Sequence, residues 1–211
     1  HYRGMLRVVR RDSGTRVYEA VAHPPTDDSP ASRAQRAAAL VALVVHKYAP
    51  LPAASLTYLV RLLGYGAPHL APQIQTALRL AKQELASCQI NGTTWYWPAD
   101  ENPASRRHTP DGAVRLLAPF DPVVWDRRRF TLLWDWTYKF EAYTPAPQRK
   151  LGYYALPLLW HDRVIGWANV TAPQGHMVVN FGYADKAPQG ADFRAALDDE
   201  LQRMAYFLAA H

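Results

Sequence analysis

The 211-residue sequence contains one cysteine, Cys88, and its longest apolar run is the nine residues of 37–45. A single cysteine cannot form an internal disulfide or a thiolate metal cluster, so the sequence predicts a reducing, cytoplasmic environment. A helix that spans a bilayer needs roughly 20 apolar residues, which argues against a membrane span. The eight histidines follow no metal-ligand spacing, and no glycine-rich phosphate loop occurs. We therefore expect no metal and no cofactor, and we expect Cys88 to pack in the core.

Acidic residues are scarce relative to basic ones. The chain has 24 Lys and Arg against 18 Asp and Glu, which gives a formal net charge of +6. Five arginines lie in the first sixteen residues, where Asp12 is the only acidic side chain. This excess favours a polyanionic partner such as nucleic acid. Because His1 stands where an initiator Met is expected, the chain is predicted to be a fragment of a longer protein.

Residues 1–22 are predicted to form a β-hairpin. Two alternating apolar runs flank Asp12-Ser13-Gly14, and the glycine supplies the positive φ of the turn. Residues 23–32 hold three prolines and two aspartates and are predicted to be a linker. The pattern Gly-Thr-x-x-Tyr occurs at 14–18 and again at 92–96. We therefore interpret residues 1–22 as the wing of a preceding, truncated winged helix.

Residues 33–98 are predicted to form three helices followed by a hairpin. Apolar residues recur at helical spacing from residue 33 to 48, in a short segment with Ser55 as its expected N-cap, and again beyond Pro72. Asn91-Gly92 is a strong hairpin signal. Three helices followed by a hairpin are typical of a winged helix, whose third helix enters the major groove of DNA. On that helix Arg79 and Lys82 lie on the polar face, and we predict that both bind DNA.

The pattern changes to period two after a polar linker at 99–112. Residues 113–211 are predicted to form an antiparallel, barrel-like β domain with a C-terminal helix, because turn residues lie where hairpins need them. Pro157 within a strand indicates an edge or a bulge. The predicted elements are strands 113–118, 138–144, 153–160, 164–170 and 177–183, and a helix at 192–209.

The least generic stretch is 117–130, which reads Leu-Ala-Pro-Phe-Asp-Pro-Val-Val-Trp-Asp-Arg-Arg-Arg-Phe. It resembles the winged-helix DNA glycosylases, bacterial proteins that remove alkylated bases and unhook interstrand crosslinks. The resemblance continues through 138–145, 149–157 and 162–163. It implies an α+β fold in which tandem winged helices and a C-terminal β-barrel surround a channel for duplex DNA.

Three adjacent arginines, Arg127, Arg128 and Arg129, cannot share one face of a regular element. At least one of them is therefore expected to reach solvent or a phosphate. For Arg127, an ion pair with Asp126 is an equal alternative, whereas phosphate contact is favoured for Arg128 and Arg129. Replacing Arg128 and Arg129 with Ala is then expected to reduce the salt dependence of DNA binding, by up to ~0.9 in slope for each phosphate that is no longer neutralised.

A second basic segment lies at the predicted hairpin tip around Arg149 and Lys150. Cations at such a tip can follow the DNA backbone while a ring packs against sugars or base edges, which makes Arg149, Lys150 and Tyr153 candidate DNA-binding residues. Tyr153 and Tyr154 fall on opposite faces of the predicted strand, so one of them is expected to be buried.

The catalytic motif of the resembled family is Gln-x-Gln or Gln-x-Asp, near the N-terminus of the full protein. Gln73-Ile74-Gln75 matches its letters, but two glutamines at i and i+2 of a helix face different directions. We therefore assign no catalytic residue and expect this chain alone to show no glycosylase activity. The alternative is a non-enzymatic winged-helix regulator. An upstream Gln-x-Gln or Gln-x-Asp would discriminate between the two.

Overall fold

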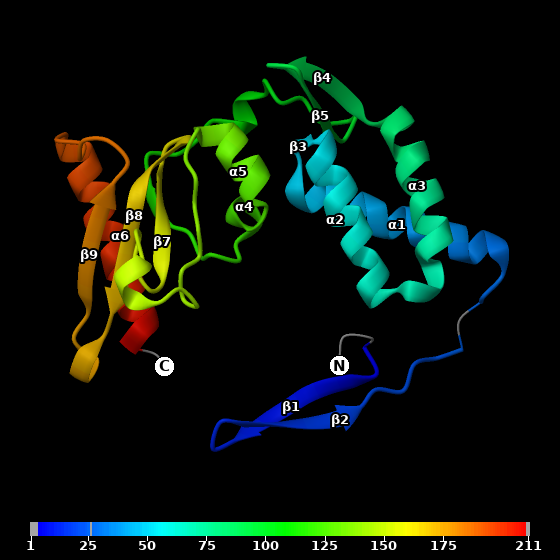
Figure 1. The fold of residues 1–211 in the computed structure, drawn as a ribbon, viewed down its shortest axis with the longest axis horizontal. Coiled ribbons are helices and arrows are strands. Elements are labelled where there is room, and N and C mark those ends of the chain that lie inside the picture. Colours follow the sequence, from blue (N-terminus) through cyan, green and yellow to red (C-terminus); the bar gives the residue numbers. More distant parts are fainter. Residues whose placement is uncertain (1–3, 26, 210–211) are drawn as a thin grey trace. The chain divides into compact units, whose positions relative to one another are not determined.

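The computed structural model describes residues 4–25 and 27–209 and divides into two compact units, 1–101 and 102–211 (Figure 1). Helices occur with three antiparallel sheets, which confirms the predicted α+β class. The outermost residues of the predicted wing and β domain and one linker residue lie outside the described residues. Within the described part, none of the helices has the length and apolar content to cross a membrane.

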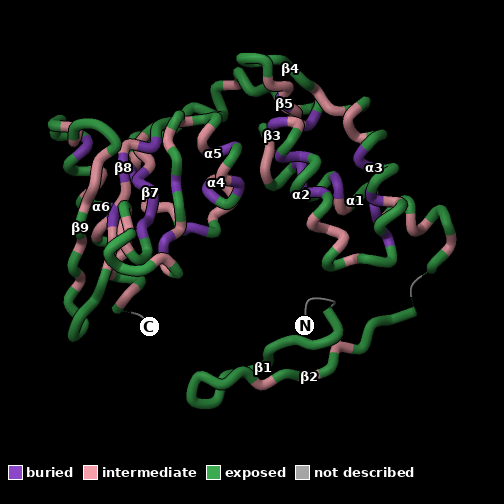
Figure 2. The backbone as a smooth tube through the Cα atoms, in the orientation of Figure 1, coloured by how far each residue is buried: buried purple, intermediate pink, exposed green. Residues whose placement is uncertain are grey.

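The N-terminal hairpin forms as predicted. Strand β1 (Leu6–Asp12) pairs antiparallel with β2 (Thr15–Ala20) across a two-residue turn. Ser13 and Gly14 occupy this turn with φ of 50° and 83°, the left-handed conformation that such tight hairpins require. Most of its residues are exposed to solvent (Figure 2). The hairpin is therefore held mainly by its own ladder of backbone hydrogen bonds.

Three helices build the core of the first unit: α1 (Pro30–Tyr48), α2 (Ala53–Gly66) and α3 (Ala71–Glu84). A 3-10 turn, η1 (Pro68–Leu70), joins the last two. Apolar residues of the helices and of the segments that join them are buried together: Ala37, Val41, Val44, Val45, Leu51, Leu56, Leu59, Val60, Leu70, Ile74, Ala77 and Leu78. The predicted N-cap of the second helix is wrong: the N-cap is Pro52, three residues earlier, and Ser55 is buried in the first turn of α2.

A three-stranded sheet completes this unit. Its order is β3 (Leu51–Pro52), β5 (Thr93–Trp97), β4 (Ala86–Ile90), and the Asn91-Gly92 turn joins β4 to β5 as predicted. The expectation that Cys88 packs in the core is wrong. Because β4 is the edge strand and most of its residues are exposed, Cys88 faces solvent.

The sheet of the second unit has the order β6 (Val114–Leu116), β7 (Ala155–Trp160), β8 (Arg163–Thr171), β9 (Val178–Tyr183). It stays open, so the expectation of a barrel is not met by the described residues. Helix α6 (Ala191–Ala209) explains why, because its side chains bind the outer edge of β6. Glu200 accepts from the Leu116 N–H at 2.6 Å, and Arg203 donates to the Val114 carbonyl at 3.4 Å.

Pro157 lies beside a bulge, as its position in a strand predicts. The register of β7 on β8 shifts between Leu158 and Leu159. Pro157 accepts a hydrogen bond from the Leu117 N–H at 2.9 Å but has no N–H to return. The ladder between β6 and β7 ends at this point.

Two short helices, α4 (Pro122–Trp125) and α5 (Arg127–Trp134), pack on one face of this sheet, and α6 packs on the other. The first core contains Val124, Phe130, Tyr138, Ala155 and Val164. The second contains Val114, Leu158 and Phe193. The remaining 3-10 turns are η2 (Arg106–His108), η3 (Ala146–Gln148) and η4 (Pro173–Gly175).

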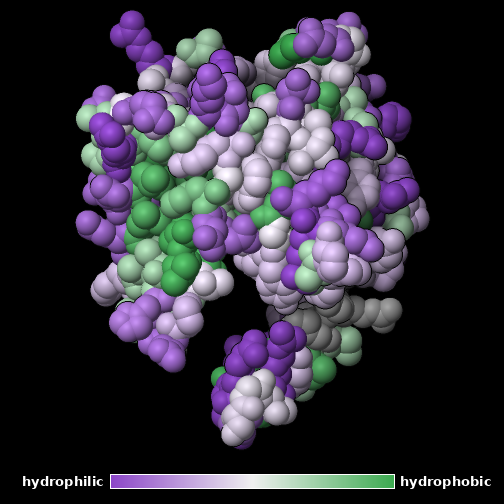
Figure 3. Space-filling view, turned by 60° about the vertical axis from the view of Figure 1, so that its left-hand side comes forward, coloured by the Kyte–Doolittle hydropathy of each residue, from purple (hydrophilic) through white to green (hydrophobic). Residues whose placement is uncertain are grey.

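The predicted strand at 138–144 is wrong. The segment is extended at its start and then turns, but it pairs with no strand of the described chain. Side chains around Tyr138 alternate between more and less buried positions, which explains the period of two in the sequence. Tyr138 itself is buried, because its ring packs on Phe130 and its hydroxyl donates to the Ala155 carbonyl at 2.7 Å. Hydrophilic side chains cover much of the surface visible in Figure 3, and a large group of hydrophobic side chains lies on the left-hand side of this view.

Candidate nucleic-acid interface

The tip of the β1–β2 hairpin brings two arginines face to face. In the antiparallel register Arg11 is the cross-strand partner of Arg16, and both are exposed. Like charges directly opposite one another destabilise a sheet. Among the described residues neither of the two has an acidic partner, whereas Arg7 pairs with Glu19 and Arg10 with Asp12. The tip therefore presents two uncompensated cations, which the phosphates of a polyanion would neutralise.

Helix α3 places its predicted DNA-binding residues in different surroundings. Arg79 is exposed, while Lys82 is half-buried and donates from Nζ to the Thr57 hydroxyl of α2 at 3.1 Å. Gln75 is exposed, but the Gln73 Oε1 atom is buried. The two glutamines thus point in different directions, as their helical spacing predicts. The β4–β5 hairpin carries no lysine or arginine between residues 86 and 97.

Arg127 is held inside the second unit. Its guanidinium donates to the carbonyl oxygens of Val124 and, at 2.8 Å, of Pro119, and lies 4.3 Å from the centre of the Tyr138 ring. Burial lowers the pKa of Arg127, and burial likewise raises the pKa of Tyr138 to about 12. Tyr138 therefore stays protonated and donates its hydrogen bond. These contacts account for Arg127 without a phosphate and without the predicted ion pair to Asp126.

Arg129 is buried, whereas Arg127 is half-buried. Its Nη2 atom donates to the carbonyl oxygens of Pro122 at 3.0 Å and Val123 at 3.4 Å, which fixes α4 against α5. Asp126 caps α5 by accepting from the Arg129 N–H at 3.3 Å. Of the three adjacent arginines, only Arg128 is exposed.

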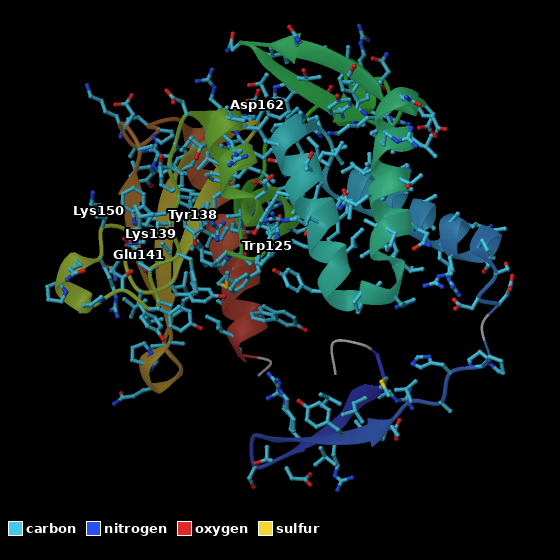
Figure 4. The ribbon with its side chains drawn as sticks, turned by 45° about the vertical axis from the view of Figure 1, so that its right-hand side comes forward. Trp125, Tyr138, Lys139, Glu141, Lys150 and Asp162 are labelled. Atoms are coloured by element: carbon cyan, nitrogen blue, oxygen red, sulfur yellow. The ribbon has the colours of Figure 1, made fainter. Side chains whose placement is uncertain are left out.

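Glu141 organises the loop that carries the second basic segment. Its buried carboxylate accepts from the backbone N–H groups of Lys150 and Leu151, both at 2.8 Å. Burial alone would raise the pKa of Glu141, but hydrogen bonds from the backbone of Leu151, Lys150 and Gly152, together with the nearby charge of Lys139, hold it below its ordinary value. Figure 4 shows the side chains of Lys139, Glu141 and Lys150 gathered on one side of this unit. The sequence pattern gave no indication of Glu141.

The cations of this loop are presented to solvent on a fixed backbone. Arg149 donates from Nε to the Thr144 carbonyl at 2.8 Å and lies 4.9 Å from the centre of the Tyr153 ring, while Lys150 is exposed. Tyr153 and Tyr154 are both exposed, so the expectation that one is buried is wrong. The strand starts only at Ala155, and both tyrosines precede it in a turn.

Glycine is required where this loop ends. Gly152 has φ +119°, which side chains rarely adopt, and a Cβ there would lie 2.3 Å from the Asn169 Oδ1 atom. Asn169 occupies this space because its Nδ2 donates to the Leu151 carbonyl at 2.7 Å. The loop from 141 to 152 is thus fastened to β8 as well as to Glu141.

Metal-ligating side chains do not gather into a cluster in the described part of the chain. No group of three or more His, Cys, Asp or Glu side chains there is arranged to hold a metal ion. Exposed cations without acidic partners are the more distinctive feature, and they suit the binding of a polyanion.

Comparison with protein families matches residues 1–207 to the family described as DNA glycosylase AlkZ-like. No solved structure is significantly similar to the chain.

Proposed function

Because the chain belongs to the AlkZ-like family of DNA glycosylases, we propose that it supplies the DNA-binding surface of a repair glycosylase that acts on alkylated or crosslinked bases. The family match favours this role over that of a non-enzymatic regulator. The observation that carries the DNA contact is the pair of facing arginines, Arg11 and Arg16, without acidic partners in the described chain.

The proposal includes a winged helix at 33–98. Its support is the topology, in which α1, a short strand, α2, α3 and a hairpin follow one another and the strand joins the hairpin in one sheet of order β3-β5-β4. In such a fold α3 enters the major groove, where the exposed Arg79 faces the DNA. Lys82, which is bound to Thr57, would reach a phosphate only after releasing this hydroxyl.

The second proposed contact surface lies at 113–211. We assign phosphate contacts to Arg128, Arg149 and Lys150, with Tyr153 packing against sugars, because their side chains reach solvent. Arg127 and Arg129 are left out, because buried carbonyl oxygens already bind their guanidinium groups.

Removing the facing arginines tests the proposed function. We expect the double variant Arg11→Ala/Arg16→Ala to bind duplex DNA with a salt slope less steep by up to about 1.8, since each neutralised phosphate contributes roughly 0.9 to the slope. The hairpin itself should not weaken, because the substitution relieves the repulsion of like charges. Fluorescence anisotropy with labelled duplex DNA at several salt concentrations measures the slope.

The matched control is Arg7→Ala/Arg10→Ala, which removes the same charge from the same hairpin. These two arginines already pair with Glu19 and Asp12, so their loss should change the salt slope less. Equal slopes for the two double variants would show that net charge alone acts, and an unchanged slope in both would contradict DNA binding by the hairpin.

The glutamines of α3 are expected to be dispensable for base release. Replacing both Gln73 and Gln75 with Ala should leave any release of alkylated bases within about twofold, or roughly 0.4 kcal/mol of transition-state stabilisation. The reason is geometric, since Ile74 between them is buried and the two amides diverge. Single-turnover assays on alkylated duplex DNA measure this, and a loss of several hundredfold would make the pair catalytic.

A further inference from the structure

Two of the aromatic groups of the second unit involve residues of α4 and α5. One group is the core around Phe130, Trp134, Trp136, Tyr138 and Trp167. The other lies at the surface and consists of Phe120, Trp125, Phe140, Tyr143 and Tyr154, which we call the aromatic surface. Its members come from three segments, 120–125, 140–143 and 154, that are distant in the sequence.

The rings of the aromatic surface contact one another in a continuous series. Phe140 lies at its centre, with ring centroids 5.4 Å from Phe120, 6.2 Å from Tyr143 and 5.3 Å from Tyr154. Trp125 extends the series from Phe120 at 5.9 Å. The packing is tilted or edge-to-face throughout, so the rings support one another.

Four of the five rings are open to solvent, and Phe140 is half-buried. Phe120 is 57% exposed and Tyr143 is 94% exposed, and Trp125 and Tyr154 are also exposed. Contiguous exposed rings of this kind are costly in water, which marks them as an interaction site.

Cations border the aromatic surface, whereas the nearby carboxylates are engaged. Lys139 is exposed and precedes Phe140, and the loop with Arg149 and Lys150 follows Tyr143. The acids of the same stretch accept from backbone N–H groups: Asp121 from Val123, Asp126 from Arg129 and Glu141 from Lys150 and Leu151. These hydrogen bonds hold the three carboxylates in place, while Lys139 and Lys150 extend their charges into solvent beside the rings.

We propose that the aromatic surface binds unpaired nucleotides of single-stranded DNA, with bases stacked on the rings and phosphates held by Lys139, Arg149 and Lys150. Every base has a π-face, so stacking on exposed rings beside cations recognises single strands without sequence preference. Paired bases inside a duplex are stacked on each other and cannot use the rings. This inference rests on the proposed DNA-binding function and adds to it a preference for opened DNA.

The test compares labelled oligothymidylate of about 15 nucleotides with a duplex of about 15 base pairs, at one salt concentration, by fluorescence anisotropy. The variant is Phe120→Ala/Tyr143→Ala, which removes the two most exposed rings. Its affinity for the single strand should fall by about tenfold or more, because each stacked base contributes several-fold to binding. Its affinity for the duplex should stay within about twofold.

The matched control is Tyr206→Ala/Phe207→Ala in α6, which removes a tyrosine and a phenylalanine that are 80% and 57% exposed. It should leave both affinities unchanged. Tyr143→Phe should retain single-strand binding, because stacking needs the ring and not the hydroxyl. If the double variant does not fold, the single variant Tyr143→Ala, at a side chain that is 94% exposed, should show the same selective loss of affinity for the single strand.

Other outcomes overturn the proposal. If the double variant loses equal affinity for single-stranded and duplex DNA, the rings belong to a general DNA contact with no preference for single strands. If it loses affinity for neither form, the aromatic surface does not take part in DNA binding. Absence of binding to both forms by the unaltered chain would instead overturn the proposed function itself. Self-association that disappears in the double variant, measured by sedimentation, would identify a second copy of the chain as the occupant.

Discussion

Replacing Glu141 with Ala is expected to lower the free energy of unfolding by about 3–5 kcal/mol, because hydrogen bonds to a charged group contribute roughly 1.5–3 kcal/mol each and two backbone donors lose their partner. Two such bonds, from the Lys150 and Leu151 N–H groups, end on the Glu141 carboxylate. Their loss should release the loop that presents Arg149 and Lys150. Urea unfolding measures the stability, and hydrogen exchange at the two amides locates the change.

The same carboxylate predicts how stability depends on pH. Since the folded protein holds the pKa of Glu141 below its ordinary value, its contribution is fully present above that ordinary value. It is lost as the pH falls through the lowered pKa of the folded state. Glu141→Gln cannot ionise, so the stability difference between it and the unaltered chain should shrink in acid.

An exposed acid of the same unit serves as the control. Asp185→Ala should change the free energy of unfolding by no more than about 0.5 kcal/mol, as is usual for surface positions. If Glu141→Ala were as mild, or if the Lys150 and Leu151 amides stayed protected from exchange, the carboxylate would not be what holds the loop.

Local signals explain why most of the helices and hairpins were predictable from the sequence. Ser13-Gly14 and Asn91-Gly92 fix two-residue turns, which in turn fix the register of the strands around them. The facing of Arg11 and Arg16 follows directly from the first of these turns. This part of the candidate interface can therefore be derived from the sequence, provided that the turn is first used to work out which residues of the two strands are paired.

Elements that depend on distant partners were not predictable. Helix α5 has three consecutive arginines, which suggest solvent, yet it buries Arg129 and Phe130. Asp126, three residues before Arg129, is an N-cap signal that indicates the start of this helix, but it does not indicate which of the arginines is buried. Glu141 gave no comparable signal, because its partners are backbone amides nine and ten residues further on.

The open sheet has a similar cause. Turn residues predict antiparallel neighbours, but closure depends on what covers the edge strand. Glu200 and Arg203 bind the edge of β6 from helix α6, and they lie 84 and 89 residues after the backbone groups that they contact. The helical sequence pattern there gives no sign of this contact. Side-chain recognition of a strand edge removes the need for a further strand to pair there.

Arg129 and Arg128 are adjacent, yet their replacement should have opposite consequences. Arg129→Ala is expected to lower the free energy of unfolding by about 3 kcal/mol, because it removes a buried charged donor and leaves the Pro122 and Val123 carbonyls without it. Arg128→Ala should alter stability by no more than about 0.5 kcal/mol. It should instead make the salt slope of DNA binding less steep by up to about 0.9.

Each variant is the control for the other, since both remove one positive charge at neighbouring positions of α5. Urea unfolding and salt-dependent anisotropy on the two proteins separate the roles, with the salt slopes measured at a temperature where Arg129→Ala remains folded. Arg129→Lys keeps the charge but loses the planar guanidinium, so it should recover little of the lost stability. A salt slope that changes in folded Arg129→Ala and not in Arg128→Ala would reverse the assignment and place the phosphate at the arginine that the structure buries.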